Sequence, residues 1–103
     1  MKTNIKFKRY IKNDPFLKKE IDFYDGDKTW YLNGIIHRED GPAIEWGDGS
    51  KSWWLNGKRH REDGPAIEWK DGTKQWWLNG KYYNRKEFPK AIEKYKKKNK
   101  TNK

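Results

Sequence analysis

The sequence contains no cysteine among its 103 residues. Without cysteine the chain can form neither a disulfide framework nor a zinc site built on thiolates, and it suits a reducing compartment. A chain of this length has room for one domain with a modest core. The absence of cysteine therefore predicts a cytoplasmic domain that folds without covalent cross-links.

Long apolar runs are also missing from the sequence. No stretch reaches the roughly 20 apolar residues that a membrane-spanning helix needs. The first residues, MKTNIKFKRYIKND, carry charges throughout, unlike the apolar core of a signal peptide. We therefore expect no membrane association. Aliphatic side chains are few, whereas Trp occurs seven times and Tyr six times, so large rings must supply most of the buried apolar area.

Acidic residues are in the minority, with 15 Asp and Glu against 25 Lys and Arg, and the formal net charge is +10. The excess lies at the two ends: residues 1–20 carry +5 and residues 90–103 carry +6, whereas residues 21–89 carry −1. A basic chain favours anionic partners. The neutral middle, however, weakens any argument that this region evolved to hold phosphates.

The middle of the chain consists of a 23-residue block written almost three times. The copies occupy residues 25–47, residues 48–70 and, in part, residues 71–84. Similarity at a fixed period indicates that one small unit stacks on itself, and that neighbours bury what a single unit cannot. Such arrays are more typical of binding proteins than of enzymes.

Turn signals divide each block into short strands. Asn-Gly at 33–34, 56–57 and 79–80 favours a tight hairpin, because both residues tolerate positive φ. Asp-Gly marks a second turn in each copy, and Asp-Gly-Pro marks a break after each His-Arg-Glu segment. The strands expected between these breaks are 21–24, 29–32, 35–37, 43–46, 52–55, 58–60, 66–69, 75–78 and 81–83.

These patterns predict a mainly β fold: an antiparallel meander of tandem 23-residue hairpin repeats in a single twisted sheet, followed by a short C-terminal helix. The helix should present Phe88, Ile92 and Tyr95 on one face, with Asn84 and Glu87 as a capping box and Pro89 placing its regular start near Phe88. The expected divisions are a basic N-terminal arm that can add an edge strand (1–20), the β-repeat sheet (21–83), an amphipathic basic helix (84–98) and a disordered tail (99–103).

The string W-[WY]-L-N-G-x-x-H-R-E-D-G-P-A-I-E-W occurs at 30–46 and again at 53–69. It resembles a short repeat of small proteins from bacteriophages, large DNA viruses and some low-GC bacteria, and it is loosely similar to MORN-type and antitoxin-like β-hairpin repeats. The resemblance covers residues 21–83. It implies a non-enzymatic β-repeat scaffold of phage or mobile-element type, acting in the host cytoplasm.

By analogy, the same resemblance implies an inhibitor that docks on a host protein or nucleoprotein, such as a defence effector, in the manner of an anti-CRISPR protein. An antitoxin-like module is a weaker alternative.

The His-Arg-Glu-Asp segment at 37–40, repeated at 60–63, is the one cluster with catalytic residue types. A His beside two carboxylates can act as a general base or a metal ligand. It can equally hold a turn, since an Asp before Gly-Pro accepts backbone hydrogen bonds and the Arg can pair with Glu45, Glu68 or the turn Asp. We favour the structural interpretation, because catalysis needs one asymmetric pocket. We therefore predict no enzyme activity, no metal and no cofactor, with hydrolysis through the two histidines as the weak alternative.

Alternation along the strands predicts two faces. The core face carries Trp30, Trp53 and Trp76, each with the Leu two residues further on. The other face carries Tyr31, Trp54 and Trp77. These three outward rings are the best candidates for binding, and three roles stay open for them: core under a second layer, anchors of a protein interface, or a platform that stacks the bases of single-stranded nucleic acid.

Lysines complete the set of candidate partner-binding residues. Near the rings these are Lys51, Lys58, Lys74 and Lys81, and near the C-terminus they are Lys94, Lys97 and Lys98. A lysine run such as 94–103 is usually a solvated end, but it can also attract RNA, DNA or an acidic protein groove. We expect a host protein or nucleoprotein as the partner, direct non-specific nucleic-acid binding as the alternative, and homodimer formation through a sheet edge as a further option.

Overall fold

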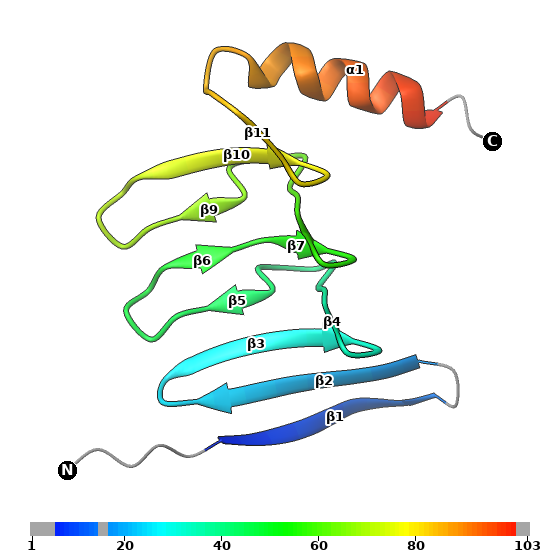
Figure 1. The fold of residues 1–103 in the computed structure, drawn as a ribbon, viewed down its shortest axis with the longest axis vertical. Helices are drawn as coiled ribbons and strands as arrows, with labels where there is room; N and C mark the ends of the chain where they lie inside the picture. Colours follow the sequence, from blue (N-terminus) through cyan, green and yellow to red (C-terminus); the bar gives the residue numbers. More distant parts are fainter. Residues whose placement is uncertain (1–5, 15–16, 101–103) are drawn as a thin grey trace.

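The computed structural model describes residues 6–14 and 17–100 of the chain, with side chains from 17 to 99 (Figure 1). Its strands are β1 (Lys6–Asp14), β2 (Leu17–Tyr24), β3 (Asp27–Leu32), β4 (Ile35–Ile36), β5 (Ile44–Glu45), β6 (Lys51–Ser52), β7 (Trp54–Leu55), β8 (Lys58–Arg59), β9 (Ile67–Glu68), β10 (Lys74–Leu78) and β11 (Lys81–Tyr83). One helix, α1 (Phe88–Lys100), follows them. The expectation of a mainly antiparallel β fold with a short C-terminal helix is confirmed.

The strands form two sheets where the sequence predicted one. A nine-stranded sheet has the order β1-β2-β3-β5-β6-β9-β10-β11, with β4 paired to β3, and β7 and β8 form a separate two-stranded sheet. The division falls at Trp53, whose N–H donates to Ala66 O while its own carbonyl accepts the N–H of His60. At this residue the chain changes pairing partner, so the ladder of β6 does not continue into β7.

The Asn-Gly turns have the predicted geometry. Asn33 and Gly34 have φ of 51° and 80°, and the turns at 56–57 and 79–80 repeat these values within a few degrees. Positive φ at both central residues defines the type I′ turn, whose twist matches that of the flanking strands.

The ends of the chain differ from the predicted divisions in their bounds. β1 pairs with β2 at one end of the strand order, in the region where the arm was expected to add an edge strand, and the boundary placed at residue 21 falls inside β2. Helix α1 begins at Phe88 and extends to Lys100, so residues 99 and 100 of the predicted disordered tail are helical. The remainder of that tail, 101–103, lies outside the described residues. No helix in the described part of the chain is long and apolar enough to cross a bilayer.

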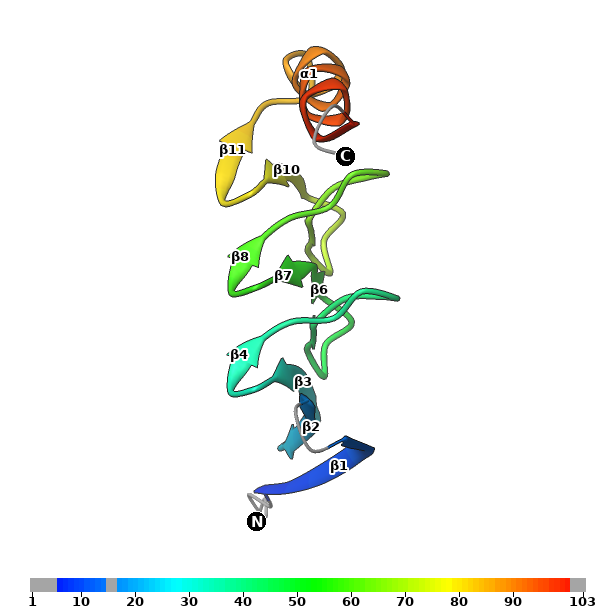
Figure 2. The same cartoon turned by 90° about the vertical axis from the view of Figure 1, so that its right-hand side faces the viewer.

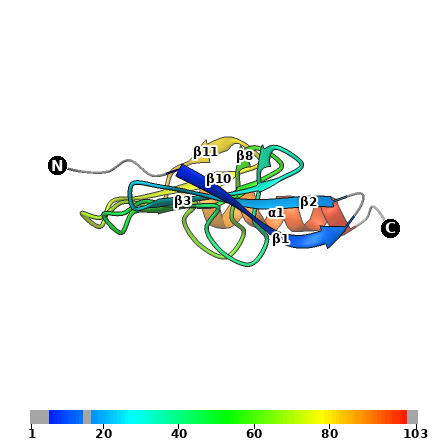
Figure 3. The same cartoon turned by 90° about the horizontal axis from the view of Figure 1, so that it is seen from below.

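The chain covers both faces of the central strands (Figure 2). Seen edge-on, β4, β8 and β11 fold back on one side, here named the return face, and the connections 37–43 and 60–66 project on the other, here named the loop face. The result is a slab with principal extents of 47 × 39 × 16 Å, which is seen end-on in Figure 3.

The core is small and its placement corrects the predicted faces. The buried apolar side chains are Ala43, Ala66, Ile67, Leu78 and Phe88. Of the predicted core residues only Leu78 is buried, and Trp30, Trp53 and Trp76 with their other leucines are half-buried. Ser52, predicted to lie on the outward face beside Trp54, is 1% exposed, and so is Ile67, its partner in the adjacent strand β9. Alternation alone could not reveal that both sides are covered.

Candidate functional site

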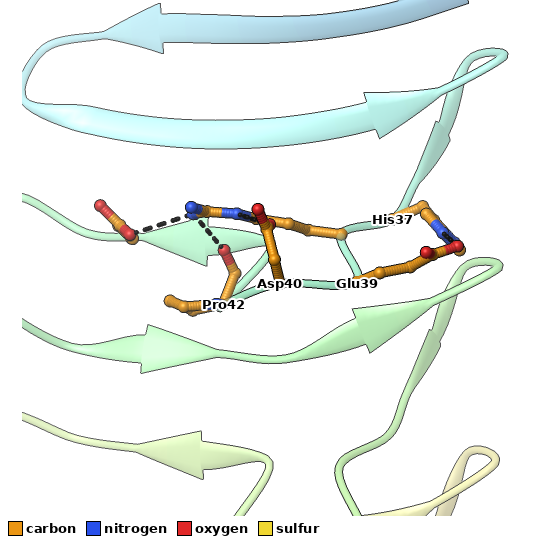
Figure 4. Close-up of polar contacts among 6 residues, drawn as sticks. His37, Glu39, Asp40 and Pro42 are labelled. Atoms are coloured by element: carbon orange, nitrogen blue, oxygen red, sulfur yellow. Dashed lines mark hydrogen bonds and ion pairs between the residues drawn. The ribbon is translucent and has the colours of Figure 1, made fainter. Parts of the chain in front are cut away.

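The first catalytic candidate, the segment 37–40, is built around Arg38 (Figure 4). Its Nε donates to Asp40 at 3.0 Å, and its Nη1 donates to Pro42 O at 3.1 Å and to Glu45 at 3.3 Å. The guanidinium carbon lies 3.9 Å from the centre of the Trp30 ring. The hydrogen bond and positive charge of Arg38 hold the pKa of Asp40 below its ordinary value. Arg38 thus closes the loop and covers Trp30, as the structural interpretation expects.

Arg61 makes the same contacts in the second segment. It reaches Asp63 at 3.1 Å, Pro65 O at 3.1 Å and Glu68 at 3.2 Å. Its guanidinium carbon is 3.8 Å from the centre of the Trp53 ring. A Cβ added at Gly64 would lie 3.0 Å from that same carbon. A side chain at Gly64 would therefore press on the guanidinium, so glycine gives Arg61 the most room beside the backbone.

The two histidines support the next Asn-Gly turn. Asn56 N–H donates to His37 Nδ1 and Asn79 N–H donates to His60 Nδ1, each at 2.9 Å. Because Nδ1 accepts a hydrogen bond, Nε2 is the nitrogen that donates. His37 Nε2 donates to Glu39 at 3.2 Å, and His60 Nε2 donates to Glu62 at 3.0 Å. Each ring is thus held at both nitrogens.

A polar cavity of about 630 Å³ lies between the two loops. Four loop carboxylates, His60 and Trp53 line it, and Lys96 of α1 reaches it from above. Both arginines already bind the two Asp of this set, and the described residues contain no group of three or more His, Cys, Asp or Glu side chains placed to hold a metal ion.

The rings of the predicted ladder, Tyr31, Trp54 and Trp77, are all half-buried, and the last two contact Arg59 of β8 on the return face. Trp54 Nε1 donates to Ser52 Oγ at 2.7 Å, and Trp77 Nε1 donates to Gln75 Oε1 at 3.1 Å. The ladder is therefore neither a bare platform nor a closed core.

Arg59 is the residue that the sequence interpretation missed in this ladder. It pairs with Trp54 across β7 and β8, and its guanidinium carbon lies 5.1 Å from the Trp54 ring centre and 4.9 Å from that of Trp77. Tyr82, 51% exposed, meets the Trp77 ring edge-on at 5.7 Å. One position of the block differs in all three copies, where it holds Ile36, Arg59 and Tyr82. This variation within an otherwise constant repeat is the sequence signal that could have identified Arg59.

Two of the predicted lysines lie in a row of alternating charge on the loop face. Lys51 pairs with Glu45 and Glu68 in adjacent strands, and Lys74 pairs with Glu68 on its other side. Cross-strand pairs of opposite charge stabilise a sheet. Lys51 and Lys74 can therefore stabilise the sheet through these charge pairs, and they lie away from the ring ladder.

The remaining lysines gather near the C-terminal end. Lys81, Lys94, Lys97 and Lys98 all line a groove of about 990 Å³ between α1 and the β10–β11 hairpin. Lys58 lies beside this hairpin, with its Cδ 3.6 Å from the position of a Cβ at Gly80. The structure thus brings together four of the predicted lysines and separates them from Lys51 and Lys74.

A scan against protein-family models, a search of curated proteins and a search of solved structures found no match to this chain. The resemblance to phage and viral repeats therefore stays a prediction, and the site is argued from its geometry.

Proposed function

We propose that this chain is a non-enzymatic binding protein, built from tandem 23-residue hairpin units, that docks on a negatively charged surface of a partner protein. The docking surface is the cluster of Trp54, Arg59, Trp77 and Tyr82 on the return face, here named the Arg59 cluster. Following the resemblance, the partner would be a host protein or nucleoprotein that a phage-type inhibitor blocks.

Support for tandem units comes from contacts that recur 23 residues apart. Arg38 N–H donates to Trp54 O and Arg61 N–H donates to Trp77 O, both at 3.1 Å. Gly57 N–H donates to Ile36 O and Gly80 N–H donates to Arg59 O, both at 2.9 Å. Stacked units of a solenoid are expected to repeat their nearest-neighbour contacts in this way.

The observation that carries the docking proposal is the state of Arg59. Arg38 and Arg61 each bind two carboxylates, whereas Arg59 has no carboxylate partner among the described residues. Its Nε is buried without a hydrogen-bond partner there. Nε itself is out of reach of another molecule, so the support is the missing carboxylate: a half-buried guanidinium held against two indoles without one favours an anionic group from a partner.

The composition of the cluster agrees with this role. Trp, Tyr and Arg are the side chains most enriched at the energetic centres of protein interfaces. Stacking of nucleic-acid bases is less favoured, because Arg59 lies against both Trp rings and the edge of Tyr82 meets Trp77. Direct nucleic-acid binding through the basic ends remains the alternative that the experiment must separate.

The test is an affinity pull-down from host lysate, with and without nuclease, comparing the natural chain with Arg59→Ala. We expect the natural chain to capture the same protein with and without nuclease. The affinity of Arg59→Ala for that protein should be about 30-fold lower, a loss of about 2 kcal/mol in binding free energy. Arg85→Ala, an exposed arginine outside the cluster, is the matched control and should bind normally. Equal capture by Arg59→Ala, or loss of all binding after nuclease, would contradict the proposal.

A further inference from the structure

A second surface, which shares only Tyr82 with the Arg59 cluster, is the groove between α1 and the β10–β11 hairpin. On the helix side it is lined by Lys90, Lys94 and Lys97, which are spaced i, i+4 and i+7 and so lie in one row. Lys81 of β11 also lines this groove. The groove is therefore bordered by ammonium groups from both of its walls.

The charges in this groove are not balanced from within. Lys90, Lys94 and Lys97 are exposed, and no carboxylate of the described residues forms an ion pair with them. Two acids, Glu87 and Glu93, also line the groove, but Glu87 accepts the Asn84 N–H at 3.2 Å in the helix cap. Charge complementarity therefore calls for an anionic occupant.

The rings of the groove favour a peptide over a nucleic acid. The Tyr82 ring packs edge-on against Trp77, the Lys81 ammonium lies 5.2 Å from the centre of the Tyr83 ring, and Tyr95 packs on His60 at 5.1 Å. Stacking of successive bases needs several free ring faces. Tyr83 and Tyr95 are half-buried beside their neighbours, and of the three rings only Tyr82, 51% exposed, remains open. Carboxylates need only the ammonium groups, while the half-buried Ala91 offers an apolar contact for an aliphatic stem.

The spacing of the lysines also fits an extended chain. Lys90 and Lys94 are separated by about 6 Å along the helix axis. Side chains on one face of an extended peptide recur about every 6.7 Å. We propose that this groove binds an extended acidic peptide segment, with acidic residues at alternate positions, on a partner protein. This inference rests on the lysines of the groove and does not depend on Arg59, which does not line it.

The test measures binding of a fluorescein-labelled peptide of alternating Glu and Val by fluorescence anisotropy at about 0.15 M salt, where the screening length is about 8 Å. We expect saturable binding, weakened about tenfold by the double variant Lys94→Glu/Lys97→Glu and abolished when Gln replaces Glu in the peptide. The matched control is Lys96→Glu, on the same helix, which lines the cavity between the loops and not the groove. It should bind within about twofold of the natural chain. Circular dichroism checks that α1 persists in each variant.

Three results would overturn the proposal: no binding of the Glu peptide, an equal loss in Lys96→Glu, or tight binding of an oligothymidylate of equal charge in place of the peptide. The third result would assign the groove to nucleic acid. Arg59→Ala should bind the peptide normally, so failure of the docking proposal and failure of this one are distinguishable.

Discussion

Arg38 and Arg61 explain why the string His-Arg-Glu-Asp-Gly-Pro recurs unchanged. One guanidinium binds the Asp, the proline carbonyl and a Glu of the next strand, and stacks on a Trp ring. The glycine leaves room for it, since a Cβ there would approach to 3.0 Å. Each residue type in the string therefore has a structural reason.

Arg61→Lys should lower the free energy of unfolding by about 1–2 kcal/mol, because an ammonium group cannot reproduce the planar fork or its stacking on Trp53. Urea denaturation followed by circular dichroism measures the change. Arg85→Lys, on an exposed arginine, is the control and should have no effect. A stability of Arg61→Lys equal to that of the natural chain would show that the fork is dispensable.

The Asp-Gly turns make stability depend on pH. Hydrogen bonds from the Ser50 backbone and side chain hold the pKa of Asp48 below its ordinary value of 3.8, and those from the Thr73 side chain and backbone do the same for the pKa of Asp71. A carboxyl whose folded-state pKa is lowered stabilises the fold above its unfolded pKa, and the contribution is lost as pH falls through the folded-state pKa.

The melting temperature should therefore fall as the pH decreases from about 4 toward 2. The double variant Asp48→Asn/Asp71→Asn keeps an acceptor oxygen in each turn but cannot titrate, so its melting temperature should fall less over this range. Identical pH profiles for the two proteins would exclude these carboxyls as the cause.

Among the elements, α1 completes the fold where the third copy of the block ends. Trp30 and Trp53 are covered by arginines, but the third copy has Tyr83-Asn84 in place of His-Arg, and the Asp-Gly-Pro segment that follows in the other copies is missing. Phe88 of α1 packs on Trp76 with ring centres 6.4 Å apart. Asn84 and Glu87 form the predicted capping box, with Glu87 N–H donating to Asn84 Oδ1 at 2.8 Å. The helix thus covers the last ring of the row.

Phe88→Ala should cost about 3 kcal/mol of stability, because it removes a large ring that is 8% exposed and uncovers Trp76. Chemical denaturation measures the loss, and near-ultraviolet circular dichroism should report the changed environment of Trp76. Lys90→Ala, an exposed position on the same helix, should be close to neutral. A small effect of Phe88→Ala would mean that α1 does not hold the end of the sheet.

The molecule as a whole is extended for its length. Its radius of gyration is 15.5 Å, whereas a compact chain of this size has about 13 Å. The extended sheet encloses no deep core, so stability depends on contacts between neighbouring strands. This agrees with a sequence that has few aliphatic and many aromatic residues. β1 ends one side of the sheet, and pairing of two molecules through this edge stays a prediction.

Local features could be predicted from the sequence because they depend on neighbours along the chain. The Asn-Gly turns, the helix cap and the short strands all follow from residue types a few positions apart. The assignment of faces was less successful. Trp54 and Trp77 were predicted to point outward, and whether strands would fold back over them depended on β8 and β11, which alternation within one strand does not describe.

The sequence by itself determined the order of turns and strands, the pairing of the loop arginines with nearby carboxylates and the start of α1, since each rests on short-range stereochemistry. Only the tertiary structure decided that Arg59 would lie against Trp77 of the following copy without a carboxylate, and that Lys94 would face the same groove as Lys81. The physical reason is that both arrangements depend on how neighbouring segments stack, and backbone hydrogen bonds between those segments fix that stacking.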